Sequence, residues 1–167
     1  RRQRQMCIRD RVIAAWTRAL GLGDVLADSD IALMACRGAR YHHDGEQYGS
    51  AAFCNLFLSD DKGLDVHFPY SGQRIPLVRG TAIVFDTCQP HAVIRRGSSG
   101  FQTADFASDE DLTQLFLTWE LPVEAACVAQ ALGVVFDIDP QAAAGMAQEQ
   151  VWENGARAVV NLSLIHI

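Results

Sequence analysis

Three residues of this chain, His42, Asp44 and His91, have the types and the order of a metal-binding set. His42 and Asp44 form a His-x-Asp pair, and His91 follows much later, after Gln89 and Pro90. Two neutral imidazoles and one carboxylate can occupy one face of an octahedron around Fe(II) and leave the opposite face open for reactants. The sequence therefore predicts that His42, Asp44 and His91 bind ferrous iron.

The spacing inside the His-x-Asp pair selects between two adjacent histidines. In an extended segment, residues two apart point to the same side, so His42 and Asp44 form the chelating pair. His43 then points the other way, to the outer face or to a position behind the ligands. The competing interpretation is that His42, His43 and Asp44 are polar residues of a surface turn before Gly45, because short motifs also occur by chance.

Short apolar runs separated by turn signals follow the His-x-Asp pair. Turn residues such as Gly63, Gly72 and Gly80 stand between them. Strands this short at this spacing are typical of an antiparallel sandwich or barrel. The predicted strands cover residues 51–58, 64–68, 75–78, 81–85 and 91–94, and the fold class is mainly β.

The order of these segments resembles the Fe(II)/2-oxoglutarate-dependent oxygenase superfamily. The resemblance rests on residues 40–44, 55–59, 63–68 and 79–86, closes on His91, and covers residues 39–121. It implies a double-stranded β-helix, a jelly roll braced by flanking helices, with the metal at the mouth of the barrel. It also implies hydroxylation of an unidentified small-molecule or peptide substrate by dioxygen, with 2-oxoglutarate as cosubstrate and release of succinate and CO2.

One feature departs from the family pattern. Members usually carry an Arg on the last core strand to bind the distal carboxylate of 2-oxoglutarate, but positions 101 and 102 are Phe and Gln. If residues 97–113 are an inserted loop, the last core strand is 115–121, and Gln114 stands where Arg is expected. Arg96 or Arg95 is the predicted cosubstrate-binding residue, with Lys62 as a further basic candidate.

Two polar residues are predicted to support the site. Asn55 either contacts the cosubstrate, as polar residues on this strand do in the family, or makes a cross-strand hydrogen bond. Asp86 either accepts a hydrogen bond from a ligating imidazole and fixes its tautomer, or is a turn residue.

Composition narrows the class of protein. With 167 residues, 49% of them hydrophobic, one core can be buried, and a pI of about 5.2 argues against a large nucleic-acid surface. We expect no membrane partner, and the five cysteines, which show no paired spacing, predict reduced thiols and a cytoplasmic location. Residues 1–11 and 162–167 resemble translated sequencing-adaptor reads, so the predicted native domain is 12–161.

Elements outside the predicted barrel complete the expected fold. Helical spacing of apolar residues predicts a helix over 12–22, and an apolar run predicts a strand over 31–36. Helices are predicted over 123–132 and 140–152.

Two alternative functions stay open at this stage. One is a metal-binding jelly-roll module, non-catalytic or a sensor, that does not use 2-oxoglutarate. The other is a cupin-type metal isomerase or dioxygenase, which the absence of a His-x-His pair disfavours.

Overall fold

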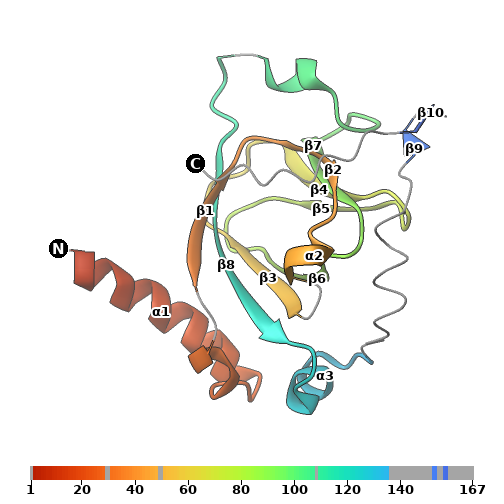
Figure 1. Ribbon diagram of the computed structural model, residues 1–167. Helices are drawn as coiled ribbons and strands as arrows, with labels where there is room; N and C mark the ends of the chain where they lie inside the picture. The colour runs from red at the N-terminus through yellow and green to blue at the C-terminus, as the bar shows by residue number, and fades with distance from the viewer. Residues whose placement is uncertain are drawn as a thin grey trace.

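The structure is a computed structural model that describes residues 2–28, 31–48, 51–107, 109–135, 152–153 and 156–157 (Figure 1). The strands of the barrel are β1 (Ala32–Cys36), β2 (Ala39–His42), β3 (Ala51–Phe57), β4 (Leu64–Phe68), β5 (Gln73–Pro76), β6 (Ala82–Asp86), β7 (His91–Arg95) and β8 (Gln114–Pro122). The helices are α1 (Arg2–Ala19), α2 (Gly45–Tyr48) and α3 (Ala126–Leu132), with short 3₁₀ turns η1 (Val25–Asp28) and η2 (Thr103–Phe106). Two further short strands, β9 (Trp152–Glu153) and β10 (Ala156–Arg157), pair antiparallel with each other.

The eight barrel strands form two antiparallel four-stranded sheets. The first sheet has the order β1-β8-β3-β6, and the second has the order β2-β7-β4-β5. Apart from β4 and β5, which pair with each other in the second sheet, consecutive strands alternate between the two sheets, which is the topology of a jelly roll. The predicted fold, a mainly β double-stranded β-helix, is confirmed.

Strand alternation gives each sheet an inner face toward the other sheet and an outer face. Phe57 and Ile83 of the first sheet pack with Leu64, Val66 and Phe68 of the second, so these side chains mark the inner faces. The outer face of the first sheet carries other residues of the same strands. Its buried members, which pack with α1, η1 and α3, are Ala52, Cys54, Leu117, Trp119 and Leu121.

Helices α1 and α3 cover the outer face of the first sheet (Figure 1). Trp16 of α1 packs edge-on against Trp119 of β8, with ring centroids 5.5 Å apart. The helix predicted over 12–22 is thus present, and its backbone extends N-terminally to Arg2, into the segment that we predict to be non-native.

Most predicted elements lie within two residues of the observed ones. Strand β8 begins at Gln114, so residues 115–121 belong to the last core strand, as the second prediction for that region has it. The strand predicted over 75–78 begins earlier, at Gln73. The helix predicted over 140–152 falls outside the described residues except for Trp152, which lies in β9 and so corrects that end of the prediction.

No helix within the described ranges is long and apolar enough to cross a membrane.

Candidate metal centre

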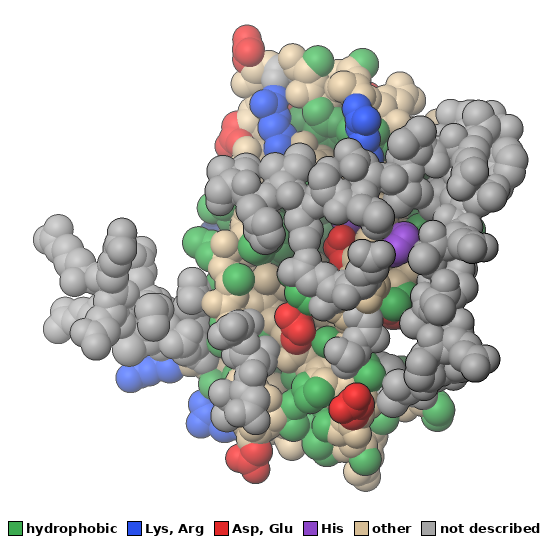
Figure 2. All heavy atoms as spheres, in the orientation of Figure 1, with side chains coloured by type: hydrophobic (Ala, Val, Ile, Leu, Met, Phe, Trp, Pro, Cys, Tyr) green, Lys and Arg blue, Asp and Glu red, His purple; other side chains and the backbone are tan. Residues whose placement is uncertain are grey.

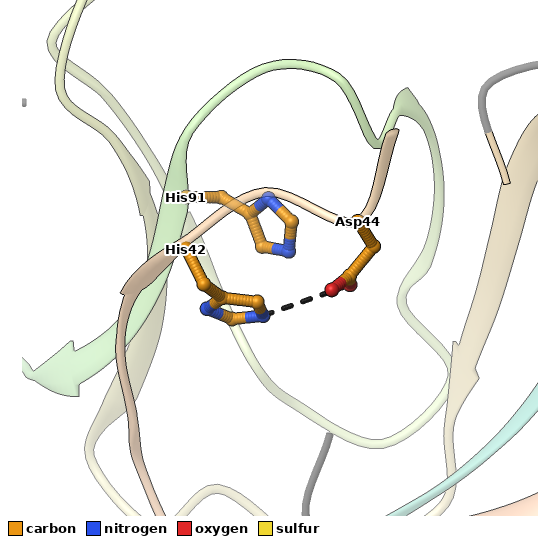
Figure 3. Close-up of side chains that lie close together, drawn as sticks. All are labelled: His42, Asp44 and His91. Carbon is orange, nitrogen blue, oxygen red and sulfur yellow. Dashed lines mark ion pairs between the residues drawn. The ribbon is translucent and has the colours of Figure 1, made fainter. Parts of the chain in front are cut away.

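His42, Asp44 and His91 lie together at one end of the second sheet (Figure 3). One possible ligand atom from each residue lies within 4.8 Å of the other two. Ligands held about 2.0–2.2 Å from a metal, in neighbouring positions, are about 3 Å apart, so small side-chain rotations close this cluster around an ion. The three residues therefore fit a single divalent metal.

The pairing of β2 with β7 brings the two histidines together. His42, the last residue of β2, is the register partner of His91, the first residue of β7. The pairing shifts between Ala39 and His42, and the imidazole rings lie 4.4 Å apart. Asp44 follows just after the strand, and its backbone N–H donates to the Thr87 carbonyl at 2.9 Å. That hydrogen bond ties the His-x-Asp segment to the loop that leads into His91.

Each imidazole is oriented by a backbone carbonyl two residues before it. His42 Nδ1 lies 2.6 Å from the Arg40 carbonyl oxygen, and His91 Nδ1 lies 2.9 Å from the Gln89 carbonyl oxygen. A carbonyl oxygen only accepts, so each Nδ1 carries the proton and donates it. In a neutral ring with the proton on Nδ1, Nε2 keeps its lone pair, the state in which histidine binds a metal.

The arrangement of His42 and Asp44 favours a cation. His42 Nε2 lies 3.7 Å from Asp44 Oδ2, and both side chains are partly exposed. With the proton on Nδ1, a nitrogen lone pair faces a carboxylate with no hydrogen between them. A divalent ion placed between these atoms would satisfy both.

His91 sits in an apolar wall. Its ring centroid is 5.0 Å from that of Phe85 and 6.0 Å from that of Phe68, and the residue is buried. Burial, together with the nearby His42, lowers the pKa of His91 to about 3. The imidazole is therefore neutral in the folded protein at every pH near 7, ready to act as a ligand.

This low pKa makes stability depend on pH. An unfolded His titrates near its ordinary value, about 6.5, so between that pH and about 3 the unfolded chain binds a proton that folded His91 does not. The contribution is complete above the unfolded pKa and is lost as pH falls, at up to about 1.4 kcal/mol per pH unit. We expect the free energy of unfolding of the metal-free protein, measured with urea, to fall between about pH 7 and pH 5. The fall should be about 2 kcal/mol larger in the wild-type chain than in His91→Gln. Parallel declines in the two proteins would contradict the buried neutral state.

The first residue of α2, Gly45, packs closely against the loop that leads into His91. A Cβ on Gly45 would lie 2.8 Å from Cys88 Sγ, closer than real Cβ atoms approach. Asp86 helps to shape the opposing loop, because its Oδ1 accepts the Cys88 backbone N–H at 2.8 Å. Asp86 thus occupies the turn position that was one of its two predicted roles, and the hydrogen bond from the His91 imidazole goes to Gln89 instead.

His43 differs from its neighbours His42 and Asp44, which belong to the cluster. It is buried, it is not part of the three-residue cluster, and its Nδ1 has no hydrogen-bond partner within the described structure. It lies close enough to His91 to lower the pKa of that imidazole. His43 is therefore a buried neighbour of the cluster and not a member of it.

The structure does not bring Arg95 or Arg96 to the metal cluster. Arg95 ends β7, four residues after His91, which corresponds to about 13 Å along a strand. A five-carbon diacid chelated at the metal reaches only about 6 Å. Both arginines are also engaged elsewhere, and their cosubstrate role has no geometric support.

The arginines belong to an ion-pair cluster at the opposite end of β7. Arg95 pairs with Glu110 at 2.8 Å, and Arg96 pairs with Asp61 and Asp65, each at 2.8 Å. Lys62, the other basic candidate, pairs with Asp111. Figure 2 shows basic and acidic side chains together at the top of that view.

Asn55 and one residue that the sequence did not single out share the barrel interior. Asn55 is buried on the inner face of β3, opposite Thr118 of β8 in the strand register. Neither Asn55 Oδ1 nor Thr118 Oγ1 has a hydrogen-bond partner within the described residues, so no cross-strand hydrogen bond joins these two atoms. In the sequence, Thr118 lies within a mostly apolar run and does not stand out. It becomes notable only because it pairs with Asn55 in the strand register.

Comparisons with known proteins find solved structures that are similar to part of this chain. No protein-family model matches the sequence, and no curated protein matches it. Protein NMB1881 from Neisseria meningitidis is 14% identical, with a TM-score of 0.37 over 56% of this chain and 74% of that chain. An RmlC-like cupin protein from Desulfovibrio desulfuricans is 15% identical, with a TM-score of 0.35 over 56% of this chain and 72% of that chain.

Proposed function

We propose that this protein is an Fe(II)- and 2-oxoglutarate-dependent oxygenase that hydroxylates an organic substrate and releases succinate and CO2. The observation that carries the proposal is the cluster of His42, Asp44 and His91, in which both imidazoles donate Nδ1–H to backbone carbonyls and keep Nε2 for a metal. Use of 2-oxoglutarate rests on the resemblance of residues 39–121 to that superfamily.

A ferrous ion bound there would supply open coordination positions at which a 2-oxo acid and dioxygen react. The chain's own residues hold and shield that position. The Arg40 and Gln89 carbonyls fix the imidazole orientations. The rings of Phe68 and Phe85 border His91 and exclude water from that side.

A second candidate is a metal-binding jelly-roll module that does not use 2-oxoglutarate. One observation favours it: the basic residues predicted to bind the cosubstrate, Arg95 and Arg96, are held in ion pairs at the far end of β7. In this candidate the same three residues bind the metal, and the open positions take another ligand.

The test is an anaerobic titration of the full chain with Fe(II) and then 2-oxoglutarate. For the oxygenase we expect stoichiometric iron binding, followed by the weak visible charge-transfer band of an iron chelate of a 2-oxo acid. Admission of air should then yield succinate. Mn(II) in place of Fe(II) serves as the control, because it fills the site without giving the visible band.

The outcomes separate the candidates. Iron binding without the band and without succinate would replace the oxygenase by the metal-binding module. No iron binding at all would overturn both candidates.

A further inference from the structure

Strand β1 is an open edge of the first sheet. It pairs with β8 on one side, and no other strand within the described residues pairs with its second side (Figure 1). An edge strand directs backbone N–H and C=O groups away from the sheet, where another strand can pair with them. The register with β8 runs without a shift from Ala32 to Cys36, so no bulge turns this edge away from a partner.

The other edge strands of the two barrel sheets carry features that discourage pairing with another chain. β5 contains Arg74 and Pro76, β6 ends at the exposed Asp86, and β2 contains the exposed Arg40 and a register shift. Charges, proline and bulges are the usual protections of a sheet edge. β1 has the sequence Ala-Leu-Met-Ala-Cys and contains neither a charge nor a proline. Its edge is therefore suited to pairing with a further strand.

Exposed apolar side chains lie beside this edge. Leu33 of β1 is 53% exposed, although its register partner on β8, Leu117, is buried in the cluster that contains α1 and α3. Leu115, which lies on the same face as Leu117, is 42% exposed. The helices therefore leave the outer face of the first sheet uncovered where it meets the β1 edge.

The sequence of the edge fits a second copy of the same chain. A two-fold axis perpendicular to the sheet pairs β1 antiparallel with itself. Centred on Met34, this axis opposes Leu33 of one copy to Ala35 of the other. All residues of the strand are uncharged, so the pairing opposes no like charges.

The residues that flank β1 carry charges of opposite sign. Asp28 and Asp30 precede the strand in the sequence, and Arg37, which is exposed, follows it. Antiparallel pairing places the start of β1 in one copy beside the end of β1 in the other. The acidic flank of each copy then faces the basic flank of its partner, and this complementarity favours a second copy over a chain of unrelated sequence.

We infer that β1 pairs with β1 of a second copy and joins the two first sheets into one continuous sheet across a dimer. A standard interface buries about 800 Å² on each partner, and one short strand with Leu33 and Leu115 beside it buries less. The dimer should therefore depend on concentration, with a dissociation constant of roughly 1–100 μM. His42 and His91 lie at strands of the second sheet, so this pairing does not require a metal.

Sedimentation velocity of the full chain, from about 1 to about 500 μM, measures the association. The wild-type chain should pass from monomer to dimer over this range. Leu33→Lys places a cation on each copy at the paired edges and should weaken dimerisation by at least about tenfold, because each dimer contains the change twice. Leu33 is more than half exposed, so the variant should keep its fold, which circular dichroism checks.

The matched control is Leu58→Lys. Leu58 is 38% exposed and donates its backbone N–H to Leu115 of β8, at the end of β3, two strands in from the β1 edge. This variant should dimerise like the wild-type chain. A wild-type chain that stays monomeric at the highest concentration, or equal weakening in the two variants, would overturn the inference.

Met34→Cys tests the register. Directly opposed residues on antiparallel strands have Cα atoms about 4.5–5.5 Å apart, within the range of about 4.4–6.8 Å that a disulfide spans. On oxidation we expect a covalent dimer in Met34→Cys, above any that the native thiols form in the wild-type chain, and no such increase in Leu58→Cys. A crosslink in Met34→Cys no more abundant than in the wild-type chain would overturn the pairing at β1.

Discussion

Replacing Asp44 by Asn is expected to weaken Fe(II) binding by at least about 100-fold and to abolish succinate formation. Residues that only orient a metal ligand are worth about 10–100-fold in affinity, and Asp44 is the one carboxylate of the cluster. The Asn side chain keeps the shape and removes the charge that faces His42 Nε2 at 3.7 Å. Anaerobic calorimetric titration with Fe(II) measures the loss.

The matched control is His43→Gln. His43 is adjacent in sequence and buried, but lies outside the cluster, so this variant should bind Fe(II) within about threefold of the wild-type affinity, as expected for a residue that is neither a ligand nor a hydrogen-bond partner of one. Equal losses in the two variants would mean that Asp44 acts through folding of the loop. Full iron affinity in Asp44→Asn would remove Asp44 from the ligand set.

The second large effect is expected for Arg96→Met, which should lower the free energy of unfolding by about 2–3 kcal/mol. Arg96 Nε donates to Asp65 at 2.8 Å, and the Asp65 side chain is only 6% exposed. Without Arg96, that carboxylate stays buried and unpaired, which is costly. Because the Arg96 side chain is 39% exposed, solvent reduces the cost below that of a fully buried pair. Urea unfolding at pH 7 measures it.

Two further variants test whether the loss of stability comes from the unpaired Asp65 carboxylate. Arg95→Met breaks the pair with the more exposed Glu110 and should cost less than about 1 kcal/mol. Adding Asp65→Asn to Arg96→Met should recover much of the stability, since no charge is then left unpaired. Should Arg96→Met instead retain full stability and weaken 2-oxoglutarate binding tenfold, the cosubstrate role predicted from sequence would be right.

The His42–Asp44 part of the metal cluster could be predicted from sequence because strand alternation is local, and the motif order of the resembled superfamily supplied its distant partner, His91. Strand alternation alone separates His42 and Asp44 from His43, and His91 follows a turn at the start of an apolar run. The barrel was predictable for a similar reason, since the turns at Gly63, Gly72 and Gly80, all at positive φ, divide the apolar runs into strands.

Features that depend on pairing between distant segments were not predictable. The sequence places Arg95 and Arg96 near His91, but extended geometry carries them to the other end of β7, where Asp61, Asp65 and Glu110 meet them. Thr118 gains its significance only from its register with Asn55. The backbone carbonyls that orient the imidazoles cannot be recognised in the sequence, because every residue has a backbone carbonyl.

The two ends of strand β7 have different structural roles. His91 at its start faces the metal cluster, and Arg95 at its end, followed by Arg96, closes the barrel through charge pairs. Sites more than about 7–10 Å apart that share no partner contribute almost independently. Substitutions at the charged end are therefore expected to leave the cluster of His42, Asp44 and His91 unchanged, and substitutions in that cluster are expected to leave the charge pairs intact. The two ends of one short strand thus carry separate sites that can be substituted independently.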